Sequence, residues 1–559
     1  MRRLAWAPPG RAPMHRFAGR RDEVMSLLVT RWRSSRMLAA IRSAAVLGID
    51  AYDVTVEVDV ANGLPHWTTV GLPASAVKES RERVGAALLN AGFTVPPRRI
   101  TINLAPADIR KDGTAFDLPI ALGVLVGAGV LESEAVSRHT FVGELGLDGT
   151  LRPVRGALSI ARMLTARPVE AMSALVLPRA NLAEASLVRK LFLVAPATLT
   201  ELVEWLGRSS LPTVDRPTVA NDPVDETDFS DVAGQESAKR ALTVAAAGGH
   251  GVLLIGPPGS GKTMLARRLP TILPALTTAE SLEVTAVHSV AGLLDPTLGA
   301  VTRRPFRAPH HSVSTAGLVG GGSLPRPGEV SLAHHGVLFL DELLEFPRSV
   351  LEALRQPMED GFVSIARAAA SLRYPARFAL VAAMNPCPCG HAGDSARACV
   401  CAATEVIRYR ARLSGPLADR IDIHVQVPPV SLERLAACEQ GDRSAGIRDR
   451  VEAARQLQRV RYQDDVCNAR VPGRWLDAHG GLERPARVLL AGAAERLHLS
   501  ARAFHRVLRV ARTIADLEGS ESMVSAHVAE ALGYRPRTED ALVARAAERS
   551  EVLESAATS

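Results

Sequence analysis

The sequence lacks any apolar run long enough to cross a membrane. Its longest apolar stretch, residues 116–131, contains Asp117 and is shorter than the roughly 20 residues that a spanning helix needs. Residues 1–36 are rich in arginine and lack the sustained apolar segment of a secretory signal. They are predicted to be a disordered basic extension or a wrongly assigned start, because Met37 opens directly onto patterned sequence. No membrane partner is therefore expected.

Lysine is scarce: it occurs five times, so that 61 of the 66 basic residues are arginine. The net charge of +7 would suit a polyanionic partner such as a nucleic acid. The strong preference for arginine, together with abundant alanine, is also what a coding bias produces. Charge alone therefore leaves a nucleic-acid partner open.

Cysteine is sparse as well, with six in 559 residues, which excludes a scaffold built on disulfides. Four of the six lie between residues 387 and 401. Clustered thiols in a large chain favour a reducing, cytoplasmic setting. The sequence also shows no repeat of about 20 to 50 residues.

The patterns that are present predict an α/β protein of several domains. Alternating apolar residues from Val54 and a strand-like segment at residues 100–104 predict a compact α+β domain. Farther along, strand and helix patterns alternate as in a parallel sheet, and helical periodicity dominates after that. The predicted divisions are an extension at 1–36, the α+β domain at 37–207, a linker at 208–229, the parallel-sheet core at 230–430, a helical segment at 431–535 and a tail at 536–559.

A glycine-rich motif predicts a nucleotide site. It follows an apolar strand, precedes a helical segment and fits the G-x-x-x-x-G-K-[ST] pattern of a phosphate-binding loop, or P-loop. Its glycines let backbone N–H groups close around phosphate, and the helix N-terminus adds a favourable dipole. We expect Lys262 to reach the β- and γ-phosphates of ATP and the Thr263 hydroxyl to bind Mg²⁺. The motif consists of Gly256, Pro257, Pro258, Gly259, Ser260, Gly261, Lys262 and Thr263.

Two further apolar strands end in polar residues that suit ATP hydrolysis. The strand at residues 337–340 is predicted to deliver Asp341 beside the metal, and Glu342 can polarise the attacking water. The strand at residues 378–384 ends in Asn385, whose side chain would hold that water or the γ-phosphate. The alternative for Asn385 is a turn-forming residue before a proline.

Two arginines are candidates for stabilising the phosphoryl group during transfer. Arg420 lies in the segment 414–422, and an arginine supplied across a subunit boundary stabilises charge on the transferring group. Arg502 lies at a predicted helix start, from which it would reach the nucleotide from a helical lid. A solvated surface position is the alternative for each, since the chain is rich in arginine.

The clustered cysteines form two C-x-C pairs separated by nine residues. Four thiolates on one loop suit tetrahedral Zn²⁺ in a structural role, although C-x-C is tighter than the usual spacing. The alternative is four reduced thiols in an exposed loop. The ligands would be Cys387, Cys389, Cys399 and Cys401, with His391 as a substitute.

Three segments resemble the ComM/YifB family of magnesium-chelatase-like AAA+ ATPases. They are Arg-Pro-Phe-Arg-Ala-Pro-His-His at residues 304–311, the glycine-rich and Pro-Gly-Glu stretches within 320–336, and Ser-Gly-Pro-Leu-Ala-Asp-Arg-Ile-Asp at 414–422. The resemblance implies an AAA+ P-loop core with a C-terminal helical lid, assembled into a cytoplasmic homo-hexamer. It further implies a helicase that moves on single-stranded or branched DNA and drives branch migration during natural transformation. In such rings the ATP site lies between subunits, so Arg420 would act across the boundary.

A hairpin is predicted over residues 359–378. In the similar helicases this hairpin carries a basic residue into the central pore, which here would be Arg367. Its phosphate contacts would be independent of sequence and sensitive to salt. A surface hairpin without DNA contact is the alternative.

Two histidine pairs invite a metal interpretation. They are His310 with His311 and His334 with His335. No carboxylate completes a recognisable ligand pattern around either pair. We therefore expect loop or pore roles and assign no metal to them.

The N-terminal domain resembles the Lon protease proteolytic domain, which has the ribosomal S5 domain 2-like fold, through residues 111–116 and 143–156. That family uses a lysine to activate a serine nucleophile. The serine position falls on Ala115 and the lysine position on Leu158, or on Ile160 if the match slips. Neither side chain type can perform proteolysis, so ring assembly and DNA guidance remain as roles. A polar cluster that would serve either consists of Asp108, Arg110, Lys111 and Asp112.

Three classes of function therefore remain to be separated. The first is the DNA translocase. The second is a magnesium-chelatase-type motor, against which the N-terminal domain counts because chelatase ATPase subunits are expected to lack one. The third is an ATP-dependent protease, against which Ala115 and Leu158 count, so that an active protease is not expected. Remodelling of protein partners is a further alternative.

Overall fold

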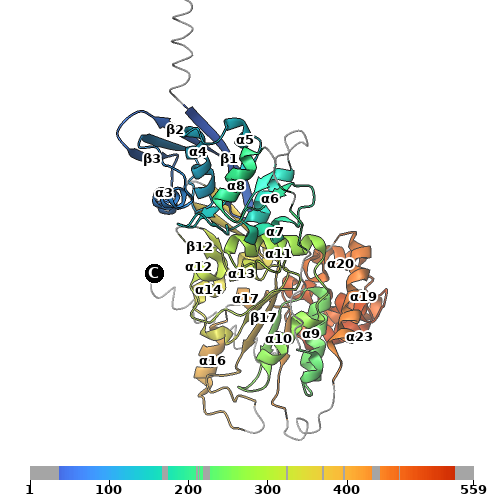
Figure 1. The fold of residues 1–559 in the computed structure, drawn as a ribbon. Helices are drawn as coiled ribbons and strands as arrows, with labels where there is room; N and C mark the ends of the chain where they lie inside the picture. Colours follow the sequence, from blue (N-terminus) through green and yellow to red (C-terminus); the bar gives the residue numbers. More distant parts are fainter. Residues whose placement is uncertain are drawn as a thin grey trace, which may run out of the picture. The chain divides into compact units, whose positions relative to one another are not determined.

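The computed structural model describes most of the chain between Met37 and Arg535 (Figure 1). Contacts divide the chain into two compact units, of which the first ends at Pro217, except that Leu47–Ile49 groups with the second. The predicted extension and tail lie outside the described residues, as does part of the predicted linker. The described residues are 37–166, 174–208, 212, 214–217, 227–322, 325–367, 370–393, 397–413, 415–430, 441–464 and 466–535.

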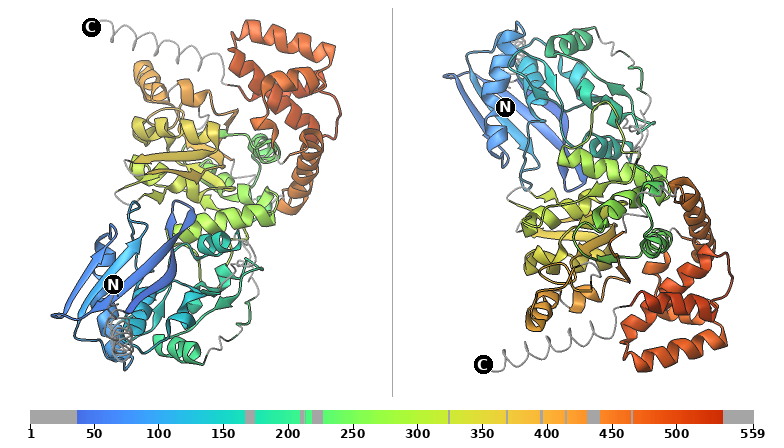
Figure 2. Two further views of the ribbon diagram at one scale, coloured as in Figure 1. Left: turned by 90° about the horizontal axis from the view of Figure 1, so that it is seen from above. Right: turned by 90° about the horizontal axis from the view of Figure 1, so that it is seen from below.

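The first unit is an α+β layer structure built on a sheet in which seven strands are described, in the order β3-β4-β2-β1-β5-β8-β9. The long strands β1 and β2 lie side by side in Figure 2. The predicted alternation from Val54 is observed, because every second residue of β2 is buried. The strands are β1 (Met37–Leu47), β2 (Asp50–Ala61), β3 (His66–Val70), β4 (Arg99–Ala105), β5 (Thr140–Phe141), β8 (Leu175–Val176) and β9 (Leu193–Val194).

Helix α4 (Asp117–Gly127) packs on this sheet and is buried along almost its whole length. Such burial explains why its sequence is apolar on all sides. The single acid of this run, Asp117, is fully buried and receives two hydrogen bonds from the Arg83 guanidinium, at 2.7 and 2.9 Å. The other main helices of the unit are α3 (Ser80–Asn90), α6 (Ala157–Thr165) and α8 (Leu199–Gly207).

The residues at the protease-like positions are apolar and packed. Leu158 and Ile160 are buried in α6, and the backbone carbonyl of Ala115 accepts a hydrogen bond from Gly143. One member of the predicted polar cluster lies in the interior: Lys111 is wholly buried, and burial lowers the pKa of its ammonium group. The exposed members are Asp108, Arg110 and Asp112.

The second unit contains a sheet whose five described strands have the order β11-β14-β17-β10-β18, and all four neighbouring pairs are parallel. The strands β10, β14 and β17 are almost entirely buried, which fits their continuous apolar sequence. The predicted parallel α/β core is thus confirmed. The strands are β10 (Val252–Ile255), β11 (Phe306–Arg307), β14 (Val337–Leu340), β17 (Ala379–Met384) and β18 (Ile423–Gln426).

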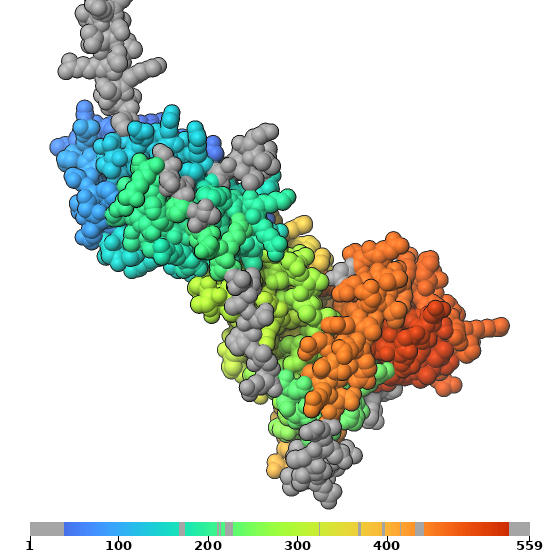
Figure 3. Space-filling model, turned by 45° about the vertical axis from the view of Figure 1, so that its right-hand side comes forward, coloured from blue at the N-terminus to red at the C-terminus, as the bar shows by residue number. Residues whose placement is uncertain are grey.

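The end of the chain that the structure describes is helical, as predicted. These helices, orange to red in Figure 3, lie beside the green segment that begins the second unit, where α19 and α22 contact α9 (Glu236–Gly248). Among the described residues no helix combines the length and apolar character needed to span a membrane. The helices are α19 (Ser444–Tyr462), α20 (Gly473–His479), α21 (Arg484–Arg496), α22 (Ala501–Leu517) and α23 (Ser525–Gly533).

Buried polar groups hold this helical segment together. The Arg512 guanidinium is fully buried and bonds the Asp516 carboxylate at 3.1 Å and the Gly480 carbonyl at 3.0 Å. The Asp516 carboxylate also accepts hydrogen bonds from the Arg461 guanidinium and the Asn468 side-chain amide. Each charge in this group therefore has its partners, which is the condition for burying charge at all.

The hairpin predicted around Arg367 is present. Strands β15 (Phe362–Arg367) and β16 (Ala370–Pro375) pair antiparallel, and Arg367 lies opposite Ala370 at the end of the hairpin where the two strands are connected. Residues 368–369 and the Arg367 side chain lie outside what the structure describes.

Removing one partner from the buried charge group should destabilise the second unit strongly. We expect Arg512→Met to lower the free energy of unfolding by about 3–5 kcal/mol, because Asp516 would keep its charge in the interior with fewer partners. Urea denaturation of the full chain, monitored by circular dichroism, measures the change in the free energy of unfolding. The matched control is Arg487→Met, whose pair with Asp477 is half exposed, and which should cost about 0–1 kcal/mol. Equal effects of the two substitutions would contradict the assignment.

Candidate functional site

The P-loop joins β10 to helix α10 (Lys262–Ile272). Gly259 and Gly261 adopt φ angles of 74° and 89°, a left-handed backbone that glycine accepts without steric cost. Gly261 is the residue before α10, so the free N–H groups of the helix start face the loop. The local sequence thus produces a backbone concavity suited to an anion.

The Lys262 ammonium lies at the centre of the loop. Its Nζ donates to the backbone carbonyls of Gly256 (2.7 Å) and Pro257 (2.9 Å) and to Asn385 Oδ1 (3.2 Å). Burial lowers the pKa of Lys262, while the charges of Asp341 and Glu342 oppose that shift. A cation held in this way is positioned for phosphate oxygens, which would replace the carbonyl partners.

The predicted metal residues lie next to each other. Thr263 Oγ1 donates to Asp341 Oδ2 at 2.7 Å, although 78 residues separate them in sequence. The strands β10 and β14 each flank β17, so their carboxyl ends meet at one edge of the sheet. A hydroxyl and a carboxylate are the oxygen ligands that Mg²⁺ prefers.

Glu342 leaves its strand in an unusual backbone conformation. Its φ is 51°, its backbone N–H donates to Asp341 Oδ1 at 3.0 Å, and its side chain is 58% exposed. A positive φ is uncommon outside glycine and is often retained at functional sites. The Glu342 carboxylate therefore faces solvent beside the cavity, where an attacking water would stand.

These residues enclose one cavity of about 450 Å³. Gly256 and Pro257 do not line it but receive the Lys262 ammonium. Met264 and Met384 line it although the sequence assigned them no role, since each reads only as an apolar neighbour of a motif residue. The lining residues are Pro258, Gly259, Ser260, Gly261, Lys262, Thr263, Met264, Asp341, Glu342, Met384 and Asn385.

A histidine that the sequence assigned to a loop or pore lies beside Glu342. His311 Nδ1 is 3.6 Å from Glu342 Oε2, and its ring meets Phe346 edge-on. The centre of the His310 ring lies 4.0 Å from the centre of the His311 ring, and His310 Nδ1 forms a hydrogen bond with the Ser312 hydroxyl at 2.8 Å. The only sequence signal for this neighbourhood is the motif at residues 304–311, because spacing alone does not reveal the contact.

The two predicted arginines do not line the cavity within one chain. Arg420 donates to the Pro416 carbonyl at 2.8 Å and forms an ion pair with Glu359, at the end of α15 (Arg355–Asp360). Arg502 lies exposed at the start of α22. Their roles in hydrolysis remain predictions, and they require a neighbouring subunit or a movement of the helices.

The pair His334 and His335 meets a carboxylate that the sequence did not suggest. Glu283 Oε2 lies 3.0 Å from Nε2 of both rings. His334 Nδ1 accepts the backbone N–H of Arg377 at 3.0 Å, and burial lowers the pKa of His334 to about 4. The neutral ring then carries its proton on Nε2 and donates it to Glu283. This tautomer leaves His334 no free lone pair for a metal, and its contact with Glu283 is a hydrogen bond from a neutral ring.

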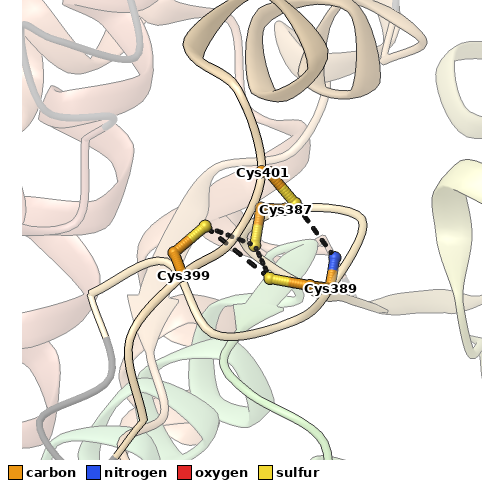
Figure 4. A group of neighbouring side chains, drawn as sticks. All are labelled: Cys387, Cys389, Cys399 and Cys401. Carbon is orange, nitrogen blue, oxygen red and sulfur yellow. Dashed lines mark hydrogen bonds between the residues drawn. The ribbon is translucent and has the colours of Figure 1, made fainter.

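The four cysteines converge on one point (Figure 4). The Sγ atoms of Cys387 and Cys389 lie 3.3 Å apart, and Cys399 Sγ lies 3.6 Å from each. Cys401 joins them within 4.8 Å, whereas His391 is not part of the group. Zn–S bonds of about 2.3 Å in a tetrahedron would place sulfur atoms about 3.8 Å apart, so the thiols fit zinc after a small expansion.

Comparison with known families matches almost the whole described chain. The family model "Magnesium chelatase, subunit ChlI" matches residues 228–435. Residues 441–535 match the model of the C-terminal part of the same subunit. Residues 56–181 match the model "Subunit ChlI of Mg-chelatase".

Individual relatives agree with the family models. Competence protein ComM of Haemophilus influenzae is 45% identical over 507 residues, covering 89% of this chain and 97% of that protein. The uncharacterized protein YifB of Escherichia coli is 42% identical with the same coverage. The magnesium-chelatase 38 kDa subunit of Cereibacter sphaeroides is 29% identical over 177 residues, covering 28% of this chain and 52% of that subunit.

Two substitutions should separate nucleotide binding from turnover. Lys262→Ala is expected to abolish ATP binding, because it removes the cation from the loop. Glu342→Gln should keep binding and lower kcat by about 10²- to 10⁴-fold, the usual contribution of a group that handles a proton in the transition state. Equilibrium binding of a fluorescent nucleotide and steady-state phosphate release measure the two effects.

A nearby glutamate provides the control. Glu345 lies three residues farther on and pairs with Arg412 at 3.4 Å, so Glu345→Gln should leave turnover unchanged. Normal turnover in Glu342→Gln would show that another group activates the water.

Proposed function

The chain belongs to the ComM/YifB family of magnesium-chelatase-like AAA+ proteins, and we propose that it is a ring-shaped ATPase that translocates on DNA. Membership of this family implies ATPase activity. The observation that carries the ATPase part of the proposal is the convergence of Lys262, Thr263, Asp341 and Asn385 from three segments of the chain on one cavity. The competence name of the Haemophilus influenzae relative supports branch migration during natural transformation as the setting.

Each polar residue of the cavity has a separate role in the proposed ATP hydrolysis. Lys262 holds the β- and γ-phosphates, and Asn385, which already bonds Lys262, orients the γ-phosphate or the attacking water. Thr263 and Asp341 would hold Mg²⁺, which neutralises charge on the phosphates when bound. Glu342 accepts the proton of the attacking water. ATP and Mg²⁺ are therefore the expected substrate and cofactor.

The cysteine cluster offers four sulfur ligands, which suit a softer metal ion than Mg²⁺. We propose that Cys387, Cys389, Cys399 and Cys401 hold a structural Zn²⁺, since soft thiolates with tetrahedral spacing select zinc. Backbone N–H groups already point at two of the sulfurs: Ala392 donates to Cys387 at 3.2 Å, and Cys389 donates to Cys401 at 3.4 Å. Such donors stabilise thiolate charge.

DNA and a homo-hexamer complete the proposal. The net charge of +7 favours a polyanion such as DNA. Arg367, on the β15–β16 hairpin, would contact the phosphates of the DNA backbone. Arg420 would act on the nucleotide of the neighbouring subunit, which explains why it lies outside its own cavity. A cytoplasmic location accords with these partners and with reduced thiols.

A magnesium-chelatase-type motor is the second candidate. The similarity to the 38 kDa subunit favours it, although that match covers about a quarter of this chain, whereas ComM is matched over 97% of its length. The sequence predicted that the N-terminal domain counts against a chelatase motor. That prediction is weakened, because the family model that matches residues 56–181 also carries the name of the chelatase subunit. A protein-remodelling motor would share the ATP site and differ in the polymer that stimulates it.

DNA should stimulate ATP turnover in a manner that fades as salt rises. The physical reason is the release of counterions when arginines contact phosphate. Phosphate release is measured with and without single-stranded and branched duplex DNA over a salt series. Arg367→Ala should lower the ratio of turnover with DNA to turnover without it. It should also reduce, by about 1, the slope of the logarithm of apparent DNA affinity against the logarithm of salt concentration.

The control for the hairpin is Arg373→Ala. Arg373 is exposed on the second strand of the same hairpin, and its guanidinium carbon lies 4.6 Å from the centre of the Phe362 ring. Turnover indifferent to every DNA at low salt would favour the chelatase-type or protein-remodelling motor.

Arg420→Ala should leave nucleotide binding intact and lower turnover of the assembled ring by about 10³- to 10⁵-fold, as loss of an arginine supplied in trans does. Glu359→Gln is the matched comparison, because it breaks the same ion pair and keeps the arginine. A loss of turnover in Glu359→Gln equal to that in Arg420→Ala would assign both effects to the pair within one chain.

A further inference from the structure

The cysteine loop begins where the nucleotide site ends. Strand β17 finishes at Met384, Asn385 binds Lys262, and Cys387 follows two residues later. No helix or strand is described between Met384 and the start of α16 (Ala403–Ala411). Asn385 therefore stands between a strand and a loop whose described part contains no regular backbone ladder.

Three contacts connect this loop and its strand to the P-loop. Gly390 packs on Pro258 so closely that an added Cβ would lie 2.5 Å from the proline Cδ. Gly256 N donates to the Met384 carbonyl at 3.3 Å, and Lys262 bonds Asn385. The loop is thus a neighbour of the phosphate-binding backbone.

The cysteines are what can hold the loop in this position. Cys387 is buried and Gly390 N donates to its carbonyl at 3.0 Å, so the first C-x-C pair and the Pro258 contact form one turn. The second pair returns from ten residues farther along the chain and contacts the first through its sulfur atoms, including the N–H···S bond from Cys389 to Cys401. A metal bound by both pairs would close this loop and remove its conformational freedom.

We propose that a zinc ion held by the four cysteines braces the P-loop, so that nucleotide affinity depends on the metal. Without the metal, Pro258 loses its support and Asn385 is no longer held against Lys262. The inference rests on the proposed ATPase function and on zinc occupancy of the cluster, and it requires no DNA.

The first experiment removes one ligand. Cys399 is the exposed member of the cluster, so Cys399→Ser should perturb folding little while lowering zinc content from about one per chain to near zero. The dissociation constant of mant-ADP, measured by fluorescence titration of the full chain, should rise about tenfold, equivalent to about 1.4 kcal/mol. The control is Cys467→Ser, which removes a thiol outside the cluster and should change neither zinc content nor affinity.

The second experiment keeps all four thiols. Gly390→Ala forces a methyl group against Pro258, so zinc should be retained while the dissociation constant of mant-ADP rises. Gly393→Ala is matched closely, because its φ of +80° resembles the +85° of Gly390 while nothing lies within 4 Å of its added Cβ. A change in both variants would indicate backbone strain alone and overturn the brace.

The remaining outcomes are equally decisive. Zinc lost from Cys399→Ser with a dissociation constant within twofold of wild type would overturn the brace and leave the ATPase proposal intact. Absence of zinc from wild-type protein purified under reducing conditions would overturn it as well. A zinc-loaded wild-type chain that binds no mant-ADP would overturn the proposed ATPase function itself.

Discussion

The parallel pairing of three buried strands is the constraint on which the candidate site depends. β10 and β14 both pair with β17, so the P-loop, Asp341 and Asn385 emerge at the same edge of the sheet. Each strand is too apolar to stand in water and is stabilised by burial on both faces. Polar chemistry is then confined to the strand ends, where the Lys262 ammonium meets the two acids and the Asn385 amide.

Around that edge, elements from distant parts of the chain control individual groups. The segment at residues 304–311 brings His311 to Glu342, and the cysteine loop brings Gly390 to Pro258. Arg420 forms an ion pair with Glu359, which lies in α15 directly before the β15–β16 hairpin, and it does not line the cavity of its own chain.

Buried polar contacts connect the helical segment to the sheet. His250, two residues before β10, bonds Asp422 at 2.8 Å through one ring nitrogen and Thr513 of α22 at 2.8 Å through the other. Burial raises the pKa of Asp422, but the hydrogen bond from His250 and the charge of Arg506 lower it overall. A carboxylate with a lowered pKa stabilises the fold above its unfolded pKa and loses that contribution as pH falls through its folded value. The helices are thereby tied to the strand that leads into the P-loop.

The sequence by itself determined the elements whose causes are local. The glycines of the P-loop, the apolar runs of β10, β14 and β17, and the helical periodicity predicted over residues 431–535 each specify backbone conformation from near neighbours. Family resemblance supplied the domain classes. Tertiary structure alone decided which side chains meet: Thr263 with Asp341, His311 with Glu342, and Glu283 with the two histidines. It also showed Lys111 to be buried, which its charged neighbours in sequence do not suggest. Such contacts depend on strand order and chain path across many residues, and no local pattern encodes them.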